Sequence, residues 1–261
     1  MILDEIAAAT RLRVERKKGE IPFEAVRAEA LALAEREQEF AFPFEQAIAR
    51  KDISFICEVK KASPSKGVIA EEFPYLDIAR DYEQAGADCI SVLTEPDYFK
   101  GEDRFLREIN DAVSIPTIRK DFVIDSYQIY EAKLLGASCV LLIAALLDTE
   151  TIREYREICD TIGLSALVEA HDAEEIARAR AAGARMVGVN NRDLRTFTVD
   201  IRNSIRLRGQ VPSDILFVAE SGIRTAKDIQ ALREAGVNGV LIGETLMRSA
   251  DKAAMLRALR G

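Results

Sequence analysis

Four segments of this 261-residue chain repeat one design, in which a helical pattern ends in a short turn containing glycine and an apolar run follows. The glycines are Gly86, Gly136, Gly183 and Gly236, at intervals of 50, 47 and 53 residues. A glycine just past the end of a helix allows the left-handed backbone conformation that closes many helices. Each of these positions therefore predicts a helix end that is followed by a buried strand.

Eight short apolar runs are present once the segments between these repeats are included. They are rich in Val, Ile and Leu and show almost no alternation of apolar and polar residues, which is typical of strands buried on both faces. The runs lie within residues 54–59, 85–93, 114–118, 135–143, 164–169, 182–190, 215–220 and 235–243. The segments between them have helical periodicity. Eight strands that alternate with helices over about 200 residues predict an α/β fold, a (β/α)8 TIM barrel.

An open, doubly wound sheet is the alternative to a closed barrel. Such a sheet is expected to have a Gly-x-Gly-x-x-Gly turn after its first strand, and this sequence has none there. Residues 1–46 precede the first predicted strand and have a helical pattern. We expect residues 1–261 to form a single barrel domain with residues 1–46 as an N-terminal helical extension. This extension either caps one mouth of the barrel or only packs against its side, and we favour the cap.

The composition excludes several classes of protein. Apolar residues make up 48% and charged residues 31% of the chain, which is enough for a large core and argues against disorder or a disulfide scaffold. The net charge of −8 disfavours binding to nucleic acid or to an anionic membrane. We find no signal-peptide pattern, no membrane-length apolar run and no C-x-x-C spacing. The sequence therefore predicts a cytoplasmic protein with reduced cysteines, at positions Cys57, Cys89, Cys139 and Cys159.

Charged and polar residues collect where the predicted strands end, and barrel enzymes place their active sites at this end. Burying several charges is costly unless they pair or bind a ligand, so their recurrence at one end predicts a binding site. Glu58 and Lys60 are two residues apart, and both can therefore point into the barrel mouth. The set comprises Glu58, Lys60, Lys120, Glu169, Asn190, Arg192, Glu220, Ser221, Gly222, Gly243 and Glu244.

The last two strands lead into AESGI at 219–223 and LIGETLM at 241–247, and each has a glycine beside a turn into a helix. In barrels these two loops commonly bind phosphate through backbone N–H groups and the positive end of a short helix. His171 is the only histidine and has no partners for a catalytic triad or a metal site, so we expect a loop or core residue there. Asp172 and the acids after it are typical of a helix N-terminus. No metal site is predicted.

Seven motifs together make the chain similar to one family. The motifs are CEVKKASPSKG (57–67), LTEPDYFKG (93–101), IRKDF (118–122), LVEAHD (167–172), VGVNNRDL (187–194), AESGI (219–223) and LIGETLM (241–247). In this order and across nearly the whole chain, they resemble the indole-3-glycerol phosphate synthase family, in which a helical N-terminal extension is also typical.

The resemblance implies a carbon–carbon lyase of tryptophan biosynthesis that needs no cofactor. Its substrate would be 1-(2-carboxyphenylamino)-1-deoxyribulose 5-phosphate, which closes to indole-3-glycerol phosphate with loss of CO2 and water. Lys120 would be the general acid that protonates the substrate carbonyl, and Glu169 the acid/base of the dehydration. Lys60 and Glu58 would also be catalytic: Lys60 would hold the substrate carboxylate and serve as a second proton donor, and Glu58 would set the position and charge of Lys60.

The remaining site residues follow from the same resemblance. Asn190 and Arg192 would bind oxygens of the sugar, and Asn190 is also a catalytic candidate. Ser63, in the loop after the first strand, and Glu220 are further substrate-binding candidates. The phosphate would lie among Ser221, Gly222, Gly243 and Glu244. The anthranilate ring would pack against Phe99, Phe122, Leu141 and Leu194.

Further expectations concern charge and capping. We expect Lys60, Lys61 and Arg119 to lower the pKa of Lys120, so that its ammonium group can donate a proton near neutral pH. The chain has no tryptophan, so an apolar cap from the N-terminal helix would use Leu3 or Ile6. The carboxylate of Glu244 is expected to turn away from the phosphate.

We expect a monomer that acts on a small anionic phosphosugar and binds neither nucleic acid nor membrane. Two alternatives remain open at this point. One is another phosphate-binding barrel enzyme, either a phosphosugar isomerase or a Schiff-base aldolase with Lys120 as its nucleophile. The other is an inactive barrel that only binds a partner, although the charged residues at the strand ends argue against it.

Overall fold

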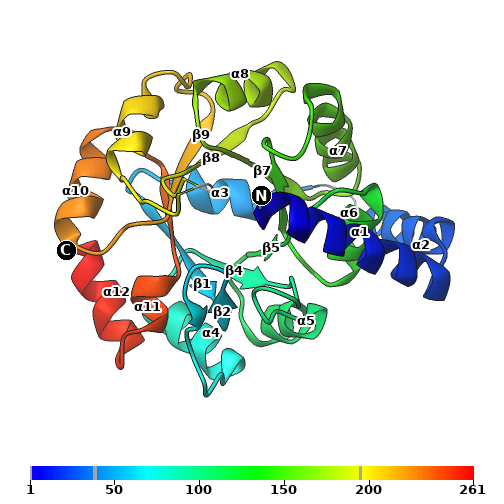
Figure 1. Cartoon of the computed structure of the whole chain (residues 1–261), viewed down its shortest axis with the longest axis horizontal. Helices are drawn as coiled ribbons and strands as arrows, with labels where there is room; N and C mark the ends of the chain where they lie inside the picture. The colour runs from blue at the N-terminus through cyan, green and yellow to red at the C-terminus, as the bar shows by residue number, and fades with distance from the viewer. Residues whose placement is uncertain (1, 38–39, 194–195) are drawn as a thin grey trace.

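Eight parallel strands close into a barrel with helices around it (Figure 1). The computed structural model describes residues 2–37, 40–193 and 196–261. The order around the barrel is β1-β10-β9-β8-β7-β6-β5-β4. The strands are β1 (Ser54–Val59), β4 (Cys89–Leu93), β5 (Thr117–Lys120), β6 (Cys139–Ile143), β7 (Ser165–Ala170), β8 (Met186–Asn190), β9 (Leu216–Glu220) and β10 (Gly239–Ile242). The predicted TIM barrel is confirmed, and the open-sheet alternative is wrong.

The third barrel strand, β5, differs from the sequence prediction in its position. It begins at Thr117 and runs to Lys120, whereas the apolar run spans residues 114–118. Pro116 has no N–H to donate to a neighbouring strand, which explains the late start. At the other end, Arg119 and Lys120 continue the strand because each finds partners for its charge, on opposite sides of the sheet.

Helices follow the strands in the alternation that the periodicity predicts. Gly86, Gly136, Gly183 and Gly236 have φ angles of 90°, 85°, 81° and 79°, so the predicted left-handed helix ends are confirmed. The helices after β1 are α4 (Tyr75–Gln84), α5 (Asp103–Ala112), α6 (Ser126–Leu134), α7 (Thr149–Thr161), α8 (Ala173–Ala181), α9 (Arg202–Arg208), α10 (Ala226–Glu234), α11 (Glu244–Met247) and α12 (Lys252–Arg260).

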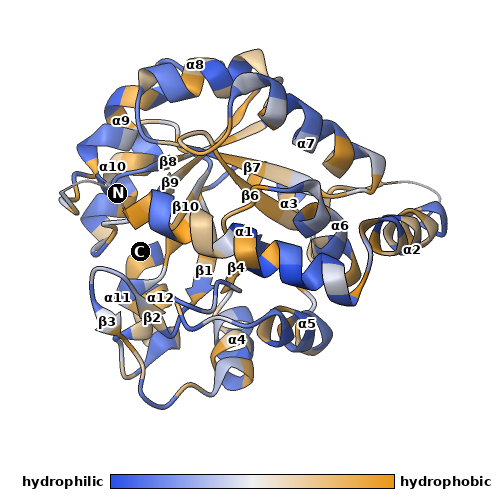
Figure 2. Ribbon diagram, turned by 45° about the vertical axis from the view of Figure 1, so that its right-hand side comes forward, coloured by the Kyte–Doolittle hydropathy of each residue, from blue (hydrophilic) through white to orange (hydrophobic). Residues whose placement is uncertain are grey.

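The core has two parts, one on each face of the barrel wall. Alternate strand residues such as Ile56 and Ile118 fill the barrel interior, and the residues between them pack against the surrounding helices. The helix α3 (Pro43–Ile48) closes the N-terminal end of the barrel, where Phe44 and Ile48 are fully buried in the interior cluster. In Figure 2 the strands are mostly orange, while the helices carry hydrophilic residues as well. The opposite, C-terminal end is thus the open one.

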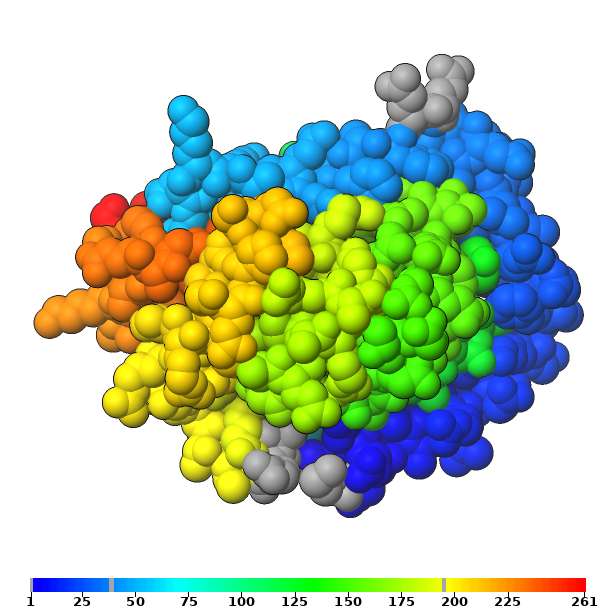
Figure 3. All heavy atoms as spheres, turned by 90° about the horizontal axis from the view of Figure 1, so that it is seen from above, coloured from blue at the N-terminus to red at the C-terminus, as the bar shows by residue number. Residues whose placement is uncertain are grey.

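Two helices precede this plug. The first, α1 (Ile2–Glu20), begins over the centre of the barrel mouth in Figure 1, and α2 (Phe23–Glu35) packs against α6. In Figure 3 the blue N-terminal segment runs along one side of the molecule beside the green segment. Ion pairs hold α1 in place, among them Arg13 with Asp121 at 2.8 Å.

A small antiparallel hairpin, β2 (Ala62–Ser63) with β3 (Gly67–Val68), follows β1 and was not predicted. All four cysteines are buried and free, as expected. Among the helices that the structure describes, none is both long and apolar enough to span a membrane.

Candidate active site

A cavity of about 430 Å³ lies at the C-terminal ends of the strands, which is a volume typical of small-molecule sites. The structure brings nearly all the predicted site residues together there. The predicted residues that line it are Glu58, Lys60, Ser63, Phe99, Lys120, Phe122, Leu141, Glu169, Asn190, Arg192, Glu220, Ser221, Gly222, Gly243 and Glu244. Leu194 lies outside the described residues.

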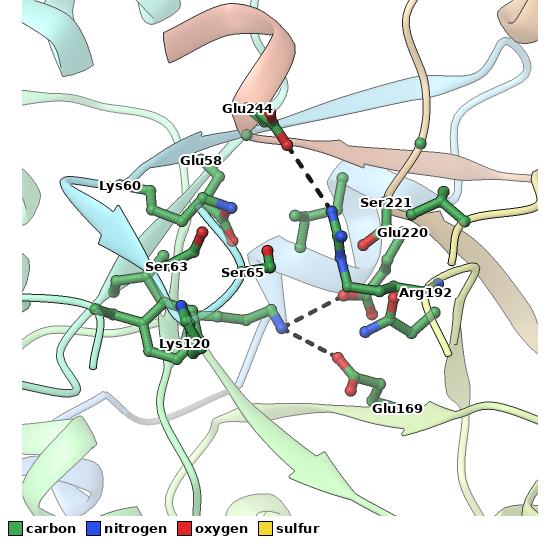
Figure 4. A pocket seen from close by; sticks show the side chains of 18 of the residues that line it. Glu58, Lys60, Ser63, Ser65, Lys120, Glu169, Arg192, Glu220, Ser221 and Glu244 are labelled. Carbon is green, nitrogen blue, oxygen red and sulfur yellow. Dashed lines mark hydrogen bonds and ion pairs between the residues drawn. The ribbon is translucent and has the colours of Figure 1, made fainter. Parts of the chain in front are cut away.

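Lys120 lies in the middle of a charged cluster (Figure 4). Its Nζ is 3.1 Å from Glu169 Oε2 and 3.4 Å from Glu220 Oε2. The three side chains come from β5, β7 and β9, and each is the last or next-to-last residue of its strand. Because the barrel brings these strand ends to one mouth, residues far apart in sequence share one small volume.

The expected lowering of the Lys120 pKa is wrong. Burial does lower the pKa of Lys120, but the carboxylates of Glu169, Glu220 and Glu58 outweigh it, so the pKa lies above its usual value. Arg119 does not lower the pKa of Lys120 as expected, because its side chain points away from the cavity and pairs with Asp103 at 2.8 Å. Lys120 is therefore fully protonated in the free site.

The two acids that contact Lys120 differ in their protonation. Burial raises the pKa of Glu169, but the charges of Lys120 and His171 outweigh it and lower the pKa to about 2. For Glu220, burial and the neighbouring carboxylates together raise the pKa to about 8 despite Lys120. The two pKa values are thus pushed apart, which favours an ionised Glu169 beside a protonated Glu220 at neutral pH. A Cβ at Gly188 would lie 2.2 Å from Glu220 Oε1, so only glycine leaves room for this acid.

Glu58 and Lys60 form a second pair at the mouth, with Oε2 and Nζ 2.5 Å apart. Their spacing of two residues places both on the inner side, as predicted. Gly243 makes room for them, because a Cβ there would lie 2.2 Å from Glu58 Oε2 and 2.9 Å from Lys60 Nζ. The glycine after β10 thus has a steric role in addition to any contact with phosphate.

The loops after β9 and β10 lie side by side at the rim of the cavity. Ser221 and Gly222 both have positive φ angles, 70° and 82°, an arrangement that only glycine adopts without strain. That the carboxylate of Glu244 turns away from the phosphate stays a prediction. This carboxylate lies between two arginines, 3.9 Å from Arg192 Nη2 and 3.1 Å from Arg248 Nε (Figure 4 shows the first pair).

An apolar wall completes the cavity. The rings of Phe99 and Phe122 have centroids 6.0 Å apart, and Leu141 is buried beside them. From the other side, Leu3 and Ile6 of α1 also line the cavity, so the N-terminal helix forms part of its wall. One face of the site is thus apolar and the other charged, which suits a ligand with an aromatic ring and anionic groups.

Comparisons with known proteins agree with this geometry. A family model described as indole-3-glycerol phosphate synthase matches residues 3–259. A protein of that name from Ruminiclostridium cellulolyticum is 62% identical over 261 residues, which cover 100% of this chain and 99% of the relative. One from Endomicrobium trichonymphae is 52% identical over 260 residues, with 100% of both chains covered. The chain belongs to the indole-3-glycerol phosphate synthase family.

Solved structures of other proteins show the same fold at low identity. The crystal structure of KGPDC from Streptococcus mutans has a TM-score of 0.63 and 10% identity, and the match covers 80% of this chain and 96% of that one. Such a likeness shows the barrel alone. Membership of the synthase family confirms the resemblance and does not support the isomerase and aldolase alternatives.

For a synthase of this family, the sequence reasoning missed one contact of a candidate catalytic residue. His171 lies in the loop after β7, as expected, but the distance of 3.7 Å between its Nε2 and Glu169 Oε1 was not foreseen. A signal was available, since His171 follows Glu169 by two residues, the spacing that identified Glu58 and Lys60. The described residues contain no group of three or more His, Cys, Asp or Glu side chains that could hold a metal ion.

Proposed function

We propose that this chain closes the indole ring of 1-(2-carboxyphenylamino)-1-deoxyribulose 5-phosphate with Lys120 as the general acid and Glu169 as the acid/base of the dehydration. The product is indole-3-glycerol phosphate, and CO2 and water leave. The observation that supports these roles best is the position of the Lys120 ammonium group between Glu169 and Glu220 inside the cavity. A proton donor and a proton acceptor are thereby held within hydrogen-bond reach of one another.

The two faces of the cavity orient the substrate. The anthranilate ring packs against Phe99 and Phe122, and its carboxylate pairs with Lys60. The phosphate lies at the opposite rim, against Ser221 and Gly222 and in reach of the arginines Arg192, Arg224 and Arg248. This placement brings the sugar carbonyl toward Lys120 and folds the ring over it, which removes much of the entropic cost of closure.

Ring closure needs a proton at the carbonyl oxygen, because a neutral aromatic ring is a weak nucleophile. The raised pKa of Lys120 keeps this acid loaded before every turnover. Transfer becomes favourable during the attack, since the alkoxide that forms at the former carbonyl is a far stronger base than an amine. CO2 then leaves from the ring carbon, and its bonding electrons restore the neutral amine.

Dehydration uses the acid pair on β7 and β9. The hydroxyl group formed in the first step must take up a proton to leave as water. Glu169 is ionised in the free site and must first gain a proton, whereas the neighbouring Glu220 is already protonated at neutral pH. Asn190 hydrogen-bonds Glu169 and fixes its orientation toward the leaving group.

We further propose that residues 1–261 act as one domain, with residues 1–46 as its extension, and as a cytoplasmic monomer. Four free, buried cysteines support a reducing compartment. The net charge of −8 argues against nucleic acid as a partner.

The roles are tested by following indole fluorescence with the carboxyphenylamino-deoxyribulose phosphate as substrate, in the wild type and in Lys120→Ala. We expect the variant to lose roughly 10²–10⁴-fold in kcat while calorimetry still detects substrate binding. Borohydride should not trap the substrate on Lys120, as it would in a Schiff-base aldolase. Folded wild type that forms no indole would rule out the proposed reaction.

A further inference from the structure

A histidine that the reaction scheme does not use lies against Glu169. His171 Nε2, 3.7 Å from Glu169 Oε1, is buried and has no hydrogen-bond partner among the described residues. On the other side of the ring, Nδ1 lies 3.0 Å from Glu175 Oε2, which also accepts a 2.7 Å bond from the backbone N–H of His171. A carboxylate at Nδ1 holds that nitrogen protonated and turns Nε2 toward Glu169.

The ring of His171 also lies at the edge of a second cavity, of about 450 Å³. Both cavities include Asn190 and Arg192 in their walls, so they are neighbours. The second one is also lined by exposed residues such as Asp172 and Asp200, and it therefore reaches the surface. Glu169 lines the first cavity and Glu175 the second, and the His171 ring lies between these two carboxylates.

The reaction in the proposed function consumes a proton in every turnover. One proton goes to the carbonyl oxygen and a second to the hydroxyl group that leaves as water. One is recovered from the methylene carbon beside the nitrogen when the double bond forms. Because the substrate carboxylate leaves as neutral CO2, the balance requires one proton from solvent in each turnover.

We propose that His171 is a positioning residue that relays protons from the second cavity to Glu169. In the relay the Nε2–H bond breaks and an Oε1–H bond forms on Glu169, and the imidazolium becomes neutral. The neutral ring then turns its unprotonated nitrogen toward Glu175 and the second cavity, where it takes up a new proton. This inference rests on the proposed function, since only the dehydration requires Glu169 to gain a proton. The 3.7 Å gap must shorten for transfer, as catalytic contacts of free enzymes commonly do when substrate binds.

The charges around the ring favour a protonated imidazole. Burial lowers the pKa of His171, but the hydrogen bond to Glu175 and the charge of Glu169 outweigh it, and the net pKa lies above its usual value. The charged groups that face the ring or its cavity are Glu169 on β7, Glu175 and Arg178 on α8, Glu220 on β9, Arg206 on α9, and Asp172, Arg192, Asp193 and Asp200 on the loops. The relay is therefore loaded near neutral pH and empties as the pH rises.

The test is the dependence of kcat on pH in the wild type, His171→Ala, Glu175→Gln and the control Asp200→Asn. We expect His171→Ala to lose about 10- to 100-fold in kcat with little change in KM, to lack the fall in kcat at high pH, and to recover activity with added imidazole. In Glu175→Gln the fall should move to lower pH, because the carboxylate that favours the imidazolium is gone. Asp200 lines the second cavity without contacting the ring, so the pH profile of Asp200→Asn should match that of the wild type.

Two results would overturn the relay alone, both with a wild type that forms indole. The first is a His171→Ala profile with the same shape as that of the wild type and no rescue by imidazole, which is the result of a purely structural role. The second, which holds even if His171→Ala does not fold, is a Glu175→Gln profile without any shift. A wild type that forms no indole overturns the proposed function and the relay with it.

Discussion

Arg119 and Lys120 are neighbours on β5, yet they lie on opposite faces of the barrel wall in two different clusters of buried charge. In the outer cluster, which surrounds Arg119, the charged groups pair with one another. Arg119 is 1% exposed and donates to Asp103 at 2.8 Å, to the Gln128 carbonyl at 2.9 Å and to Thr94 at 3.2 Å. It also lies 2.8 Å from a carboxylate oxygen of Glu131.

The inner cluster is incomplete. Three acids, Glu58, Glu169 and Glu220, share the cations Lys60 and Lys120. One oxygen of Glu220 is buried and has no hydrogen-bond partner among the described residues. A buried polar atom without a partner costs free energy, and such costs are typical of sites that a ligand completes. The outer cluster also has such an oxygen, Glu131 Oε2, but it lies 2.8 Å from Arg119. The comparison teaches that a buried charged cluster with an unsatisfied oxygen identifies an active site only where it also lines a cavity at the strand ends.

The largest difference between the clusters should appear in stability. Arg119→Met removes the buried cation that Asp103, Asp121 and Glu131 share, and we expect a loss of about 3–5 kcal/mol in the free energy of unfolding. Lys120→Met is the matched control on the same strand. It should lose less than half as much, because water can reach the mouth and the acids there can take up protons. Urea unfolding at pH 7 measures both, and equal losses would contradict the distinction.

A second prediction concerns pH. The folded state raises the pKa of Glu220 from 4.5 to about 8, so between these values the folded protein binds more protons than the unfolded chain. Stability contributed by this group is therefore present below pH 4.5 and is lost as the pH rises toward 8. Glu220→Gln does not titrate, and its stability relative to the wild type should increase from pH 5 to pH 8 by on the order of 2 kcal/mol.

Glu131→Gln, in the outer cluster, is the control for this prediction. It removes a carboxylate that pairs with Arg119, so it should destabilise the protein throughout the same pH range. Thermal unfolding of both variants from pH 5 to pH 8 gives the comparison. A constant difference between Glu220→Gln and the wild type would show that Glu220 does not hold a proton in the folded state.

The sequence was sufficient to predict the barrel because strand burial and helix ends leave local patterns. Glycines such as Gly86 and Gly236 mark helix ends, and continuous apolar runs mark strands buried on both faces. The strand-end residues were predicted for the same reason, since the fold fixes which end of each strand faces the site.

Electrostatic relations between distant residues could not be predicted. Arg119 is next to Lys120 in the sequence, so its positive charge was expected to lower the pKa of Lys120. Side chains alternate along a strand, however, and Arg119 lies on the outer face of the barrel wall. The field at Lys120 comes instead from Glu169 and Glu220, 49 and 100 residues away along the chain. The contact between His171 and Glu169 was missed although the two residues are only two apart, and the second partner, Glu175, is brought near by the start of α8.

The smallest expected effect tests whether the two clusters communicate. Arg13 on α1 donates to Asp121 of the outer cluster at 2.8 Å, and the same helix places Leu3 and Ile6 in the wall of the active-site cavity. In Arg13→Met, α1 should be held less firmly, and we expect KM to rise about 5- to 10-fold with kcat nearly unchanged, which corresponds to about 1–1.4 kcal/mol of binding.

The exposed Arg16→Met on the same helix is the matched control and should leave both constants at their wild-type values. Steady-state kinetics with the carboxyphenylamino-deoxyribulose phosphate distinguishes the possible couplings. A rise in KM means that the outer cluster acts on the apolar wall through α1. A fall in kcat at constant KM would contradict this, because it would place the coupling in β5, where Asp121 adjoins Lys120 and a shift of the strand end would move the proton donor itself.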